Sequence, residues 1–145
     1  MKTNISLISG GFDPLHSGHM NYFRDAYNYG DIVVLLNSDN WLIKKKGRPF
    51  MPWTERASIV KEIKGVISVL TFDDMEGNAI KGIQKALSYY SLPEYNVSWL
   101  NGGDRTKETT PEVEWCEDNG VNCIFGVGGN KTQSSSWILQ DWETA

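Results

Sequence analysis

The fold of this chain is decided by one stretch, SGGFDPLHSGH at residues 9–19. This stretch follows a short apolar run at residues 5–8 and leads into an amphipathic segment, an order that predicts a strand, a glycine turn and a helix. Gly10 and Gly11 lack a Cβ atom, so we expect the backbone of the turn to take positive φ and to let a ligand approach closely. Backbone N–H groups at the positive end of a helix suit an anion such as phosphate.

The two histidines of the sequence, His16 and His19, lie three residues apart where this helix begins. Residues at that spacing share one helix face, so we expect the two imidazoles to point toward one place. Beside a glycine turn, such a pair indicates phosphate chemistry. Together with Asp13 it is also a candidate zinc site, which would need one further protein ligand.

Strand-length apolar runs alternate with helical segments along the rest of the chain. We expect further strands at 31–37, 66–72, 96–101 and 121–127, helices at 17–29, 53–63, 78–90, 111–118 and 134–142, and a long, partly helical loop at 38–52. This alternation predicts a single α/β domain over residues 1–145, with a doubly wound parallel sheet of five strands in the order 3-2-1-4-5. In that order, the turns at residues 10–11 and 102–103 become walls of one cleft.

The composition excludes several classes of protein. With 40% hydrophobic and 22% charged residues, the 145-residue chain is of the ordinary globular type, and its net charge of -4 argues against a general nucleic-acid binder. Cys116 and Cys123 match no metal or redox spacing, so we expect reduced thiols in a cytoplasmic protein. We expect no signal peptide and no membrane span, because no apolar run approaches about 20 residues.

Two common nucleotide-binding patterns are missing from the sequence. Neither the P-loop pattern GxxxxGK[ST] nor a full GxGxxG follows the first strand, so a different nucleotide site is implied. A flavodoxin-like or response-regulator domain would share the sheet, but the flavin loops and the acidic phosphoacceptor cluster are not visible.

Four motifs, spread over nearly the whole chain, resemble those of the cytidylyltransferase-like nucleotidyltransferase superfamily. Residues 11–19 resemble its GxFDxxHxGH motif, and residues 101–104 resemble its GGD turn. Arg48-Pro49 followed by Glu55-Arg56 resembles its basic loop and ER pair, and residues 133–138 stand where the superfamily has a serine- or threonine-rich helix start. The resemblance is strongest to the small glycerol-3-phosphate cytidylyltransferases and to the adenylyltransferase domain that activates heptose phosphate.

The resemblance implies an enzyme that transfers CMP or AMP from CTP or ATP to a phosphorylated polyol or sugar and releases pyrophosphate. A glycerol-3-phosphate cytidylyltransferase-like activity is the first expectation, and an ADP-heptose-type adenylyltransferase is the alternative. Mg²⁺ would enter bound through the oxygens of the nucleoside triphosphate. Members of the superfamily are commonly dimers, so a homodimer is expected.

The resemblance also implies a role for individual residues. The implied catalytic residues are His16, His19, Lys46 and Arg56. The implied nucleotide-binding residues are Ser9, Gly10, Gly11, Phe12, Asp13, Gly102, Asp104, Ser134, Ser135 and Ser136. The implied acceptor-binding residues are Lys44, Arg48 and Lys131, and Trp41 or Trp53 is a further candidate for the wall of the acceptor pocket.

Other interpretations of these residues stay open at this point. The basic run at 44–48 is also what a solvated surface looks like, Arg56 also suits a surface ion pair, and Asp104 also suits a turn cap. Serines at 134–136 would cap a helix in any protein. Residues 129–132 read Gly-Asn-Lys-Thr where the glycerol-phosphate enzymes have Arg-Thr-Glu-Gly, which leaves base and acceptor open and keeps a catalytically silent nucleotide-sensing homologue as an alternative.

Overall fold

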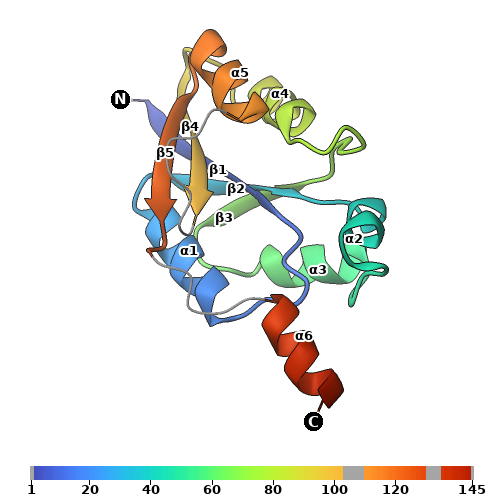
Figure 1. Ribbon diagram of the computed structural model, residues 1–145. Helices are drawn as coiled ribbons and strands as arrows, with labels where there is room; N and C mark the ends of the chain where they lie inside the picture. The colour runs from blue at the N-terminus through green and yellow to red at the C-terminus, as the bar shows by residue number, and fades with distance from the viewer. Residues whose placement is uncertain (1, 103–109, 130–134, 145) are drawn as a thin grey trace.

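The computed structural model of the protein describes residues 2–102, 110–129 and 135–144 (Figure 1). Within these ranges, five parallel strands form one sheet in the order β3-β2-β1-β4-β5. The strands are β1 (Thr3–Gly10), β2 (Asp31–Leu36), β3 (Val66–Leu70), β4 (Tyr95–Gly102) and β5 (Asn122–Val127). The helices are α1 (Ser17–Tyr27), α2 (Asp39–Lys46), α3 (Trp53–Val60), α4 (Ile80–Tyr89), α5 (Pro111–Asn119) and α6 (Ser135–Thr144). The predicted α/β class and strand order are confirmed.

Helices cover both faces of the sheet, α1 and α3 on one face and α4 and α5 on the other (Figure 1). Alternate residues of β1 serve the two sides. Ile5 and Leu7 pack in the cluster under α4 and α5, whereas Ile8 packs in the cluster under α1 and α3. Ser6, which is buried beside α1, donates its hydroxyl to the carbonyl oxygen of Ala26 at 3.0 Å. The burial of both faces explains why β2 is a continuous aliphatic run.

The direction of winding reverses between β1 and β4, which lie side by side. Leu7 is in register with Trp99, and both strands end at the same edge of the sheet. In open α/β sheets, ligands bind in the crevice that this reversal creates beyond the carboxyl ends of the strands. The fold therefore places a crevice directly beyond Gly10 and Gly102.

The segment at 38–52 differs from expectation, because it holds a complete helix, α2, where mostly loop was expected. The pattern does not show this helix because Leu42 is its one buried residue. Polar contacts hold it instead. The Ser38 hydroxyl accepts the Trp41 N–H at 3.1 Å and donates to the buried Asp74 carboxylate at 2.7 Å. Asp74 also accepts the Ser38 N–H and the Asn37 side-chain amide, at 2.8 and 3.1 Å.

Burial keeps one of the two cysteines protonated. Cys116 and Cys123 are both reduced thiols. Burial, with a smaller contribution from the neighbouring Cys123, raises the pKa of the Cys116 thiol to about 12. Cys116 is therefore a protonated, unreactive core residue at neutral pH.

In the part of the chain that the structure describes, no helix has the length and apolar character needed to cross a bilayer.

A close backbone approach dictates Gly30 between α1 and β2. Gly30 directly follows the helix range of 17–29 expected from the sequence, but Asn28 is the C-cap and Gly30 stands two residues beyond it. Gly30 has φ of 153°, and a Cβ atom there would lie 2.4 Å from the Asn4 carbonyl oxygen. The glycine is therefore required by the space left beside β1.

We predict that Gly30→Ala destabilises the protein by about 2 kcal/mol or more, because backbone must shift to admit the methyl group. Gly47→Ala is the matched control. Gly47 also has positive φ, 92°, but nothing lies within 4 Å of the place that a Cβ atom would take there, so its cost should be about 1 kcal/mol. Urea unfolding of both variants measures the difference, and equal losses would contradict the steric explanation.

Candidate functional site

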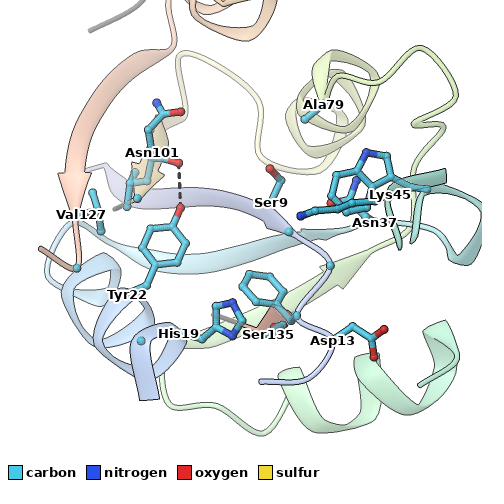
Figure 2. Close-up of a pocket in the computed structure, with 18 of the residues that line it drawn as sticks. Ser9, Asp13, His19, Tyr22, Asn37, Lys45, Ala79, Asn101, Val127 and Ser135 are labelled. Carbon is cyan, nitrogen blue, oxygen red and sulfur yellow. Dashed lines mark hydrogen bonds between the residues drawn. The ribbon is translucent and has the colours of Figure 1, made fainter. Parts of the chain in front are cut away.

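A cavity of about 490 Å³ lies beyond the carboxyl ends of β1 and β4 (Figure 2). It brings together residues that are far apart in the sequence, from β1, α1, α2, β4, α5 and the start of α6. Ten residues to which the sequence assigns roles line it: Ser9, Gly10, Gly11, Phe12, Asp13, His16, His19, Lys46, Gly102 and Ser135. The cleft expected from the strand order is therefore present.

The two histidines cap α1 reciprocally. His16 is the N-cap residue, and its ring Nδ1 accepts the backbone N–H of His19 at 3.3 Å. The His19 Nδ1 accepts the backbone N–H of His16, also at 3.3 Å. The rings stack with their centroids 3.7 Å apart and their planes 19° apart. This is a capping box made of two imidazoles, and it fixes both rings at the cavity wall.

These hydrogen bonds decide where the imidazole protons lie. A nitrogen that accepts a hydrogen bond carries no proton, so in each neutral ring the proton is on Nε2. The pair thus presents Nε2–H donors, the type of group that stabilises negative charge on phosphate oxygens.

The glycine turn differs from expectation in its conformation. Neither Gly10 nor Gly11 has positive φ, and the left-handed residue is Phe12, with φ of 48°. Gly10 and Gly11 are required because neighbouring side chains leave no space for a Cβ atom. A Cβ atom at Gly10 would lie 2.9 Å from the Phe12 ring, and one at Gly11 would lie 2.9 Å from Leu42.

Phe12 supports the histidine pair from below. Its buried ring meets His19 edge to face, with centroids 4.9 Å apart and planes at 80°. It also contacts Phe23 of α1, with centroids 5.2 Å apart. Backbone in a sparsely populated region that is held by such packing is typical of functional turns.

Asp13 and Lys46 form a pair at the edge of the cavity. The buried Asp13 carboxylate accepts the backbone N–H groups of Phe50 and Met51, at 2.6 and 2.7 Å. Lys46 Nζ lies 2.9 Å from the same carboxylate and also donates to the Asp13 carbonyl oxygen. Asp13 therefore holds the loop after α2 against the glycine turn and keeps the Lys46 ammonium at the cavity wall.

Arg56 lies beneath the cavity and does not line it. Its side chain has 0% exposure, and it donates to the carbonyl oxygens of Gly11, Asn37 and Met51 at 2.9, 2.9 and 3.0 Å. A further bond of 2.7 Å joins it to the Asp39 carboxylate. In this arrangement Arg56 positions the walls of the site, and the surface ion pair considered from the sequence is not what it forms.

Only some of the basic side chains at residues 44–48 line the cavity. Lys45 and Lys46 line the cavity, and Lys45 Nζ stands 4.8 Å from the centre of the Trp41 ring. Trp41, one of the two tryptophans considered for the acceptor pocket, also lines it, whereas Trp53 donates its indole N–H to the Leu36 carbonyl oxygen at 3.1 Å. Lys44 and Arg48 are exposed and are not among the lining residues.

Some of the predicted residues cannot be placed. Asp104, Lys131 and Ser134 lie outside the described residues, and Ser136 is described only as part of α6. Ser135 is placed: its hydroxyl donates to the Pro14 carbonyl oxygen at 2.7 Å, which ties the start of α6 to the turn before α1.

Several lining residues were missed in the sequence. Tyr22 bridges the cavity floor, because its hydroxyl donates to the Leu100 carbonyl oxygen at 3.0 Å (Figure 2). Asn37, Asn101 and Glu112 also line the cavity. The available signal was a polar residue at the end of an apolar strand, which both Asn37 and Asn101 show.

The zinc set considered from the sequence does not form. No group of three or more His, Cys, Asp or Glu side chains comes together as a metal site among the residues that the structure describes. The Asp13 carboxylate is engaged by Phe50, Met51 and Lys46, and the Nδ1 atoms of both histidines are engaged by backbone.

The family model of cytidylyltransferase-like proteins matches residues 7–134. The chain belongs to this family. The resemblance inferred from the four motifs is therefore confirmed, and with it the general kind of protein, a cytidylyltransferase-like nucleotidyltransferase domain.

Two relatives show how far the similarity extends. The chain is 41% identical over 134 residues to the Bifunctional protein HldE of Geobacter metallireducens, covering 88% of this chain and 25% of that protein. It is 34% identical over 98 residues to the ethanolamine-phosphate cytidylyltransferase of Arabidopsis thaliana, covering 67% of this chain and 22% of that protein. The chain thus spans about a quarter of the length of these curated relatives.

Solved structures support the fold. The crystal structure of the lipopolysaccharide core biosynthesis protein from Thermoplasma volcanium GSS1 superposes with a TM-score of 0.66 at 19% identity, covering 89% of this chain and 99% of that one.

We predict that Arg56→Met lowers the free energy of unfolding by about 3 kcal/mol or more, because three carbonyl oxygens lose a charged donor. Asp39→Asn removes only the charge of a partly exposed partner and should cost less than about 1 kcal/mol. Urea unfolding of the two variants checks this. Equal, small losses would contradict the positioning role of Arg56.

Proposed function

We propose that this protein is a nucleotidyltransferase that transfers CMP or AMP from a nucleoside triphosphate to a phosphorylated polyol or sugar. The observation that carries the proposal is the reciprocally capped histidine pair, His16 and His19, at the wall of a cavity formed by the ends of β1 and β4. Family membership supports the reaction class. The base and the acceptor are finer points of the proposal.

The reaction needs little covalent chemistry from the protein. A phosphate oxygen of the acceptor forms a bond to the α-phosphorus in line, while the bond from that phosphorus to the pyrophosphate oxygen breaks. Negative charge spreads over the α-phosphoryl oxygens and the departing pyrophosphate. Catalysis then consists of holding the two substrates in line and placing donors where this charge develops.

The residues of the cavity supply these two functions. The Nε2–H groups of His16 and His19 would stabilise the developing charge on the nucleotide. Lys45 and Lys46, which both line the cavity, would neutralise phosphate groups. The Gly10–Gly11 turn lines the cavity beside α1, where the triphosphate would lie.

Magnesium belongs to the nucleotide substrate in this proposal. Mg²⁺ binds through one or two carboxylates and substrate phosphates in such sites, and it neutralises the triphosphate.

Among acceptors, glycerol 3-phosphate is the first choice and a heptose phosphate, with ATP as donor, is the alternative. We also propose a cytoplasmic setting, which the two reduced thiols support. Assembly as a homodimer stays a prediction.

We predict pyrophosphate release with at least one pair drawn from the four nucleoside triphosphates and a panel of phosphorylated polyols and sugars, in the presence of Mg²⁺. A coupled pyrophosphate assay measures it. If the folded protein releases no pyrophosphate with any of these pairs, the proposal is wrong. Nucleotide binding without release would favour a catalytically silent sensor.

We predict that His16→Asn and His19→Gln each lower kcat about 10²-fold or more, because each removes an Nε2–H donor. Both replacements retain side chains that suit an N-cap box, so the melting temperature should change by only a few degrees. Steady-state kinetics and thermal unfolding test the pair of expectations. Turnover within about threefold of wild type would contradict the assigned role of the histidines.

A further inference from the structure

Two buried N–H groups on cavity-lining side chains have no hydrogen-bond partner in the described structure. They are the indole Nε1 of Trp99 and the amide Nδ2 of Asn101, on residues that are 3% and 5% exposed. A buried donor without an acceptor is costly, and native proteins rarely keep one unless a ligand or water satisfies it. A pair on one strand, both beside the same cavity, is therefore a sign of ligand binding.

The two residues lie on the same side of β4, since side chains two apart on a strand share a face. Trp99 packs in the cluster under α4 and α5, opposite to the face that carries α1 and the histidines. Figure 2 shows Ser9 and Asn101 projecting toward the side of the sheet on which Ala79 lies. This part of the cavity is thus separate from the histidine wall.

A hydrogen-bond acceptor also lines the cavity beside these two donors. Glu112, near the start of α5, also lines it, and one of its carboxylate oxygens accepts the Ala79 N–H at 3.2 Å. Ala79 is the N-cap residue of α4, so Glu112 holds the entry to that helix against α5. This side of the cavity therefore combines N–H donors with a carboxylate.

We propose that Trp99, Asn101 and Glu112 form an acceptor subsite that selects substrates bearing hydroxyl groups on the carbon chain. The inference rests on the proposed function and narrows its substrate class. A hydroxyl group accepts a hydrogen bond from an N–H and donates one to a carboxylate, so a polyol or sugar satisfies all three side chains. An ammonium group has only donors and leaves both N–H groups unsatisfied.

The two N–H donors disfavour acceptor substrates that carry an ammonium group, which a carboxylate alone would favour. Glu112 by itself would attract a cationic group such as that of ethanolamine phosphate. The unpaired N–H groups of Trp99 and Asn101 reverse this preference for a cation. A site that donates hydrogen bonds rejects a ligand that cannot accept them.

The test is calorimetric titration of the whole chain with sn-glycerol 3-phosphate, ribitol 5-phosphate, a hexose phosphate and O-phosphoethanolamine, each with an unreactive Mg–nucleotide analogue present. We expect at least one polyol or sugar phosphate to bind about tenfold or more tightly than O-phosphoethanolamine. Trp99→Phe and Asn101→Leu should each weaken that binding about threefold to tenfold and leave nucleotide affinity unchanged.

Trp115→Phe is the matched control, because Trp115 packs on the same cluster and does not line the cavity. It should leave acceptor affinity unchanged. Asn101→Leu keeps the test decisive if Trp99→Phe fails to fold. Equal or tighter binding of O-phosphoethanolamine, absence of polyol and sugar phosphate binding, or variants that weaken only nucleotide binding would each overturn the subsite.

The two proposals fail separately. Turnover of a polyol phosphate that is unaffected by both variants would overturn the subsite and leave the nucleotidyltransferase standing. Selective polyol-phosphate binding that the variants weaken, without pyrophosphate release, would support the subsite and contradict the proposed reaction.

Discussion

The guanidinium of Arg56 is the interaction on which the geometry of the site depends. It joins the glycine turn, the end of β2, the start of α2 and the loop before α3 through Gly11, Asn37, Asp39 and Met51. A buried charge is tolerated only where its hydrogen bonds are satisfied. Each of these segments is consequently held where it meets the cation, and the cavity forms between them.

The Asp13 carboxylate provides a second anchor at the other end of the β1–α1 turn. It holds the backbone of Phe50 and Met51 and the ammonium of Lys46. One buried cation and one buried anion thus tie the β1–α1 turn to the segment between β2 and α3. The histidine pair then needs no support from that segment, since it is fixed by its own capping box and by Phe12. Rigid donors beside a tethered basic segment are what in-line transfer between two phosphates requires.

The sequence predicts much of this because its signals are local. Alternation of apolar runs with helical segments is enough for the parallel α/β class, and the spacing of His16 and His19 is enough for their shared direction. The position of the Arg56 side chain could not be predicted from local sequence signals. Its place at the start of a helix suggests a cleft-facing side chain, but tertiary contacts turn it beneath the cavity. Trp99 looks like an ordinary core residue of β4, and only the three-dimensional packing shows an indole N–H without a partner.

The most direct test of the account is ¹⁵N NMR of the imidazole rings in a chain with two histidines. The capping hydrogen bonds predict that both rings of the free protein are neutral Nε2–H tautomers. Adding a Mg–nucleotide analogue should shift both Nε2–H resonances while each Nδ1 keeps its backbone bond. Protons on Nδ1, or Nε2–H resonances that do not respond to saturating nucleotide, would contradict the assignment of this wall to the triphosphate.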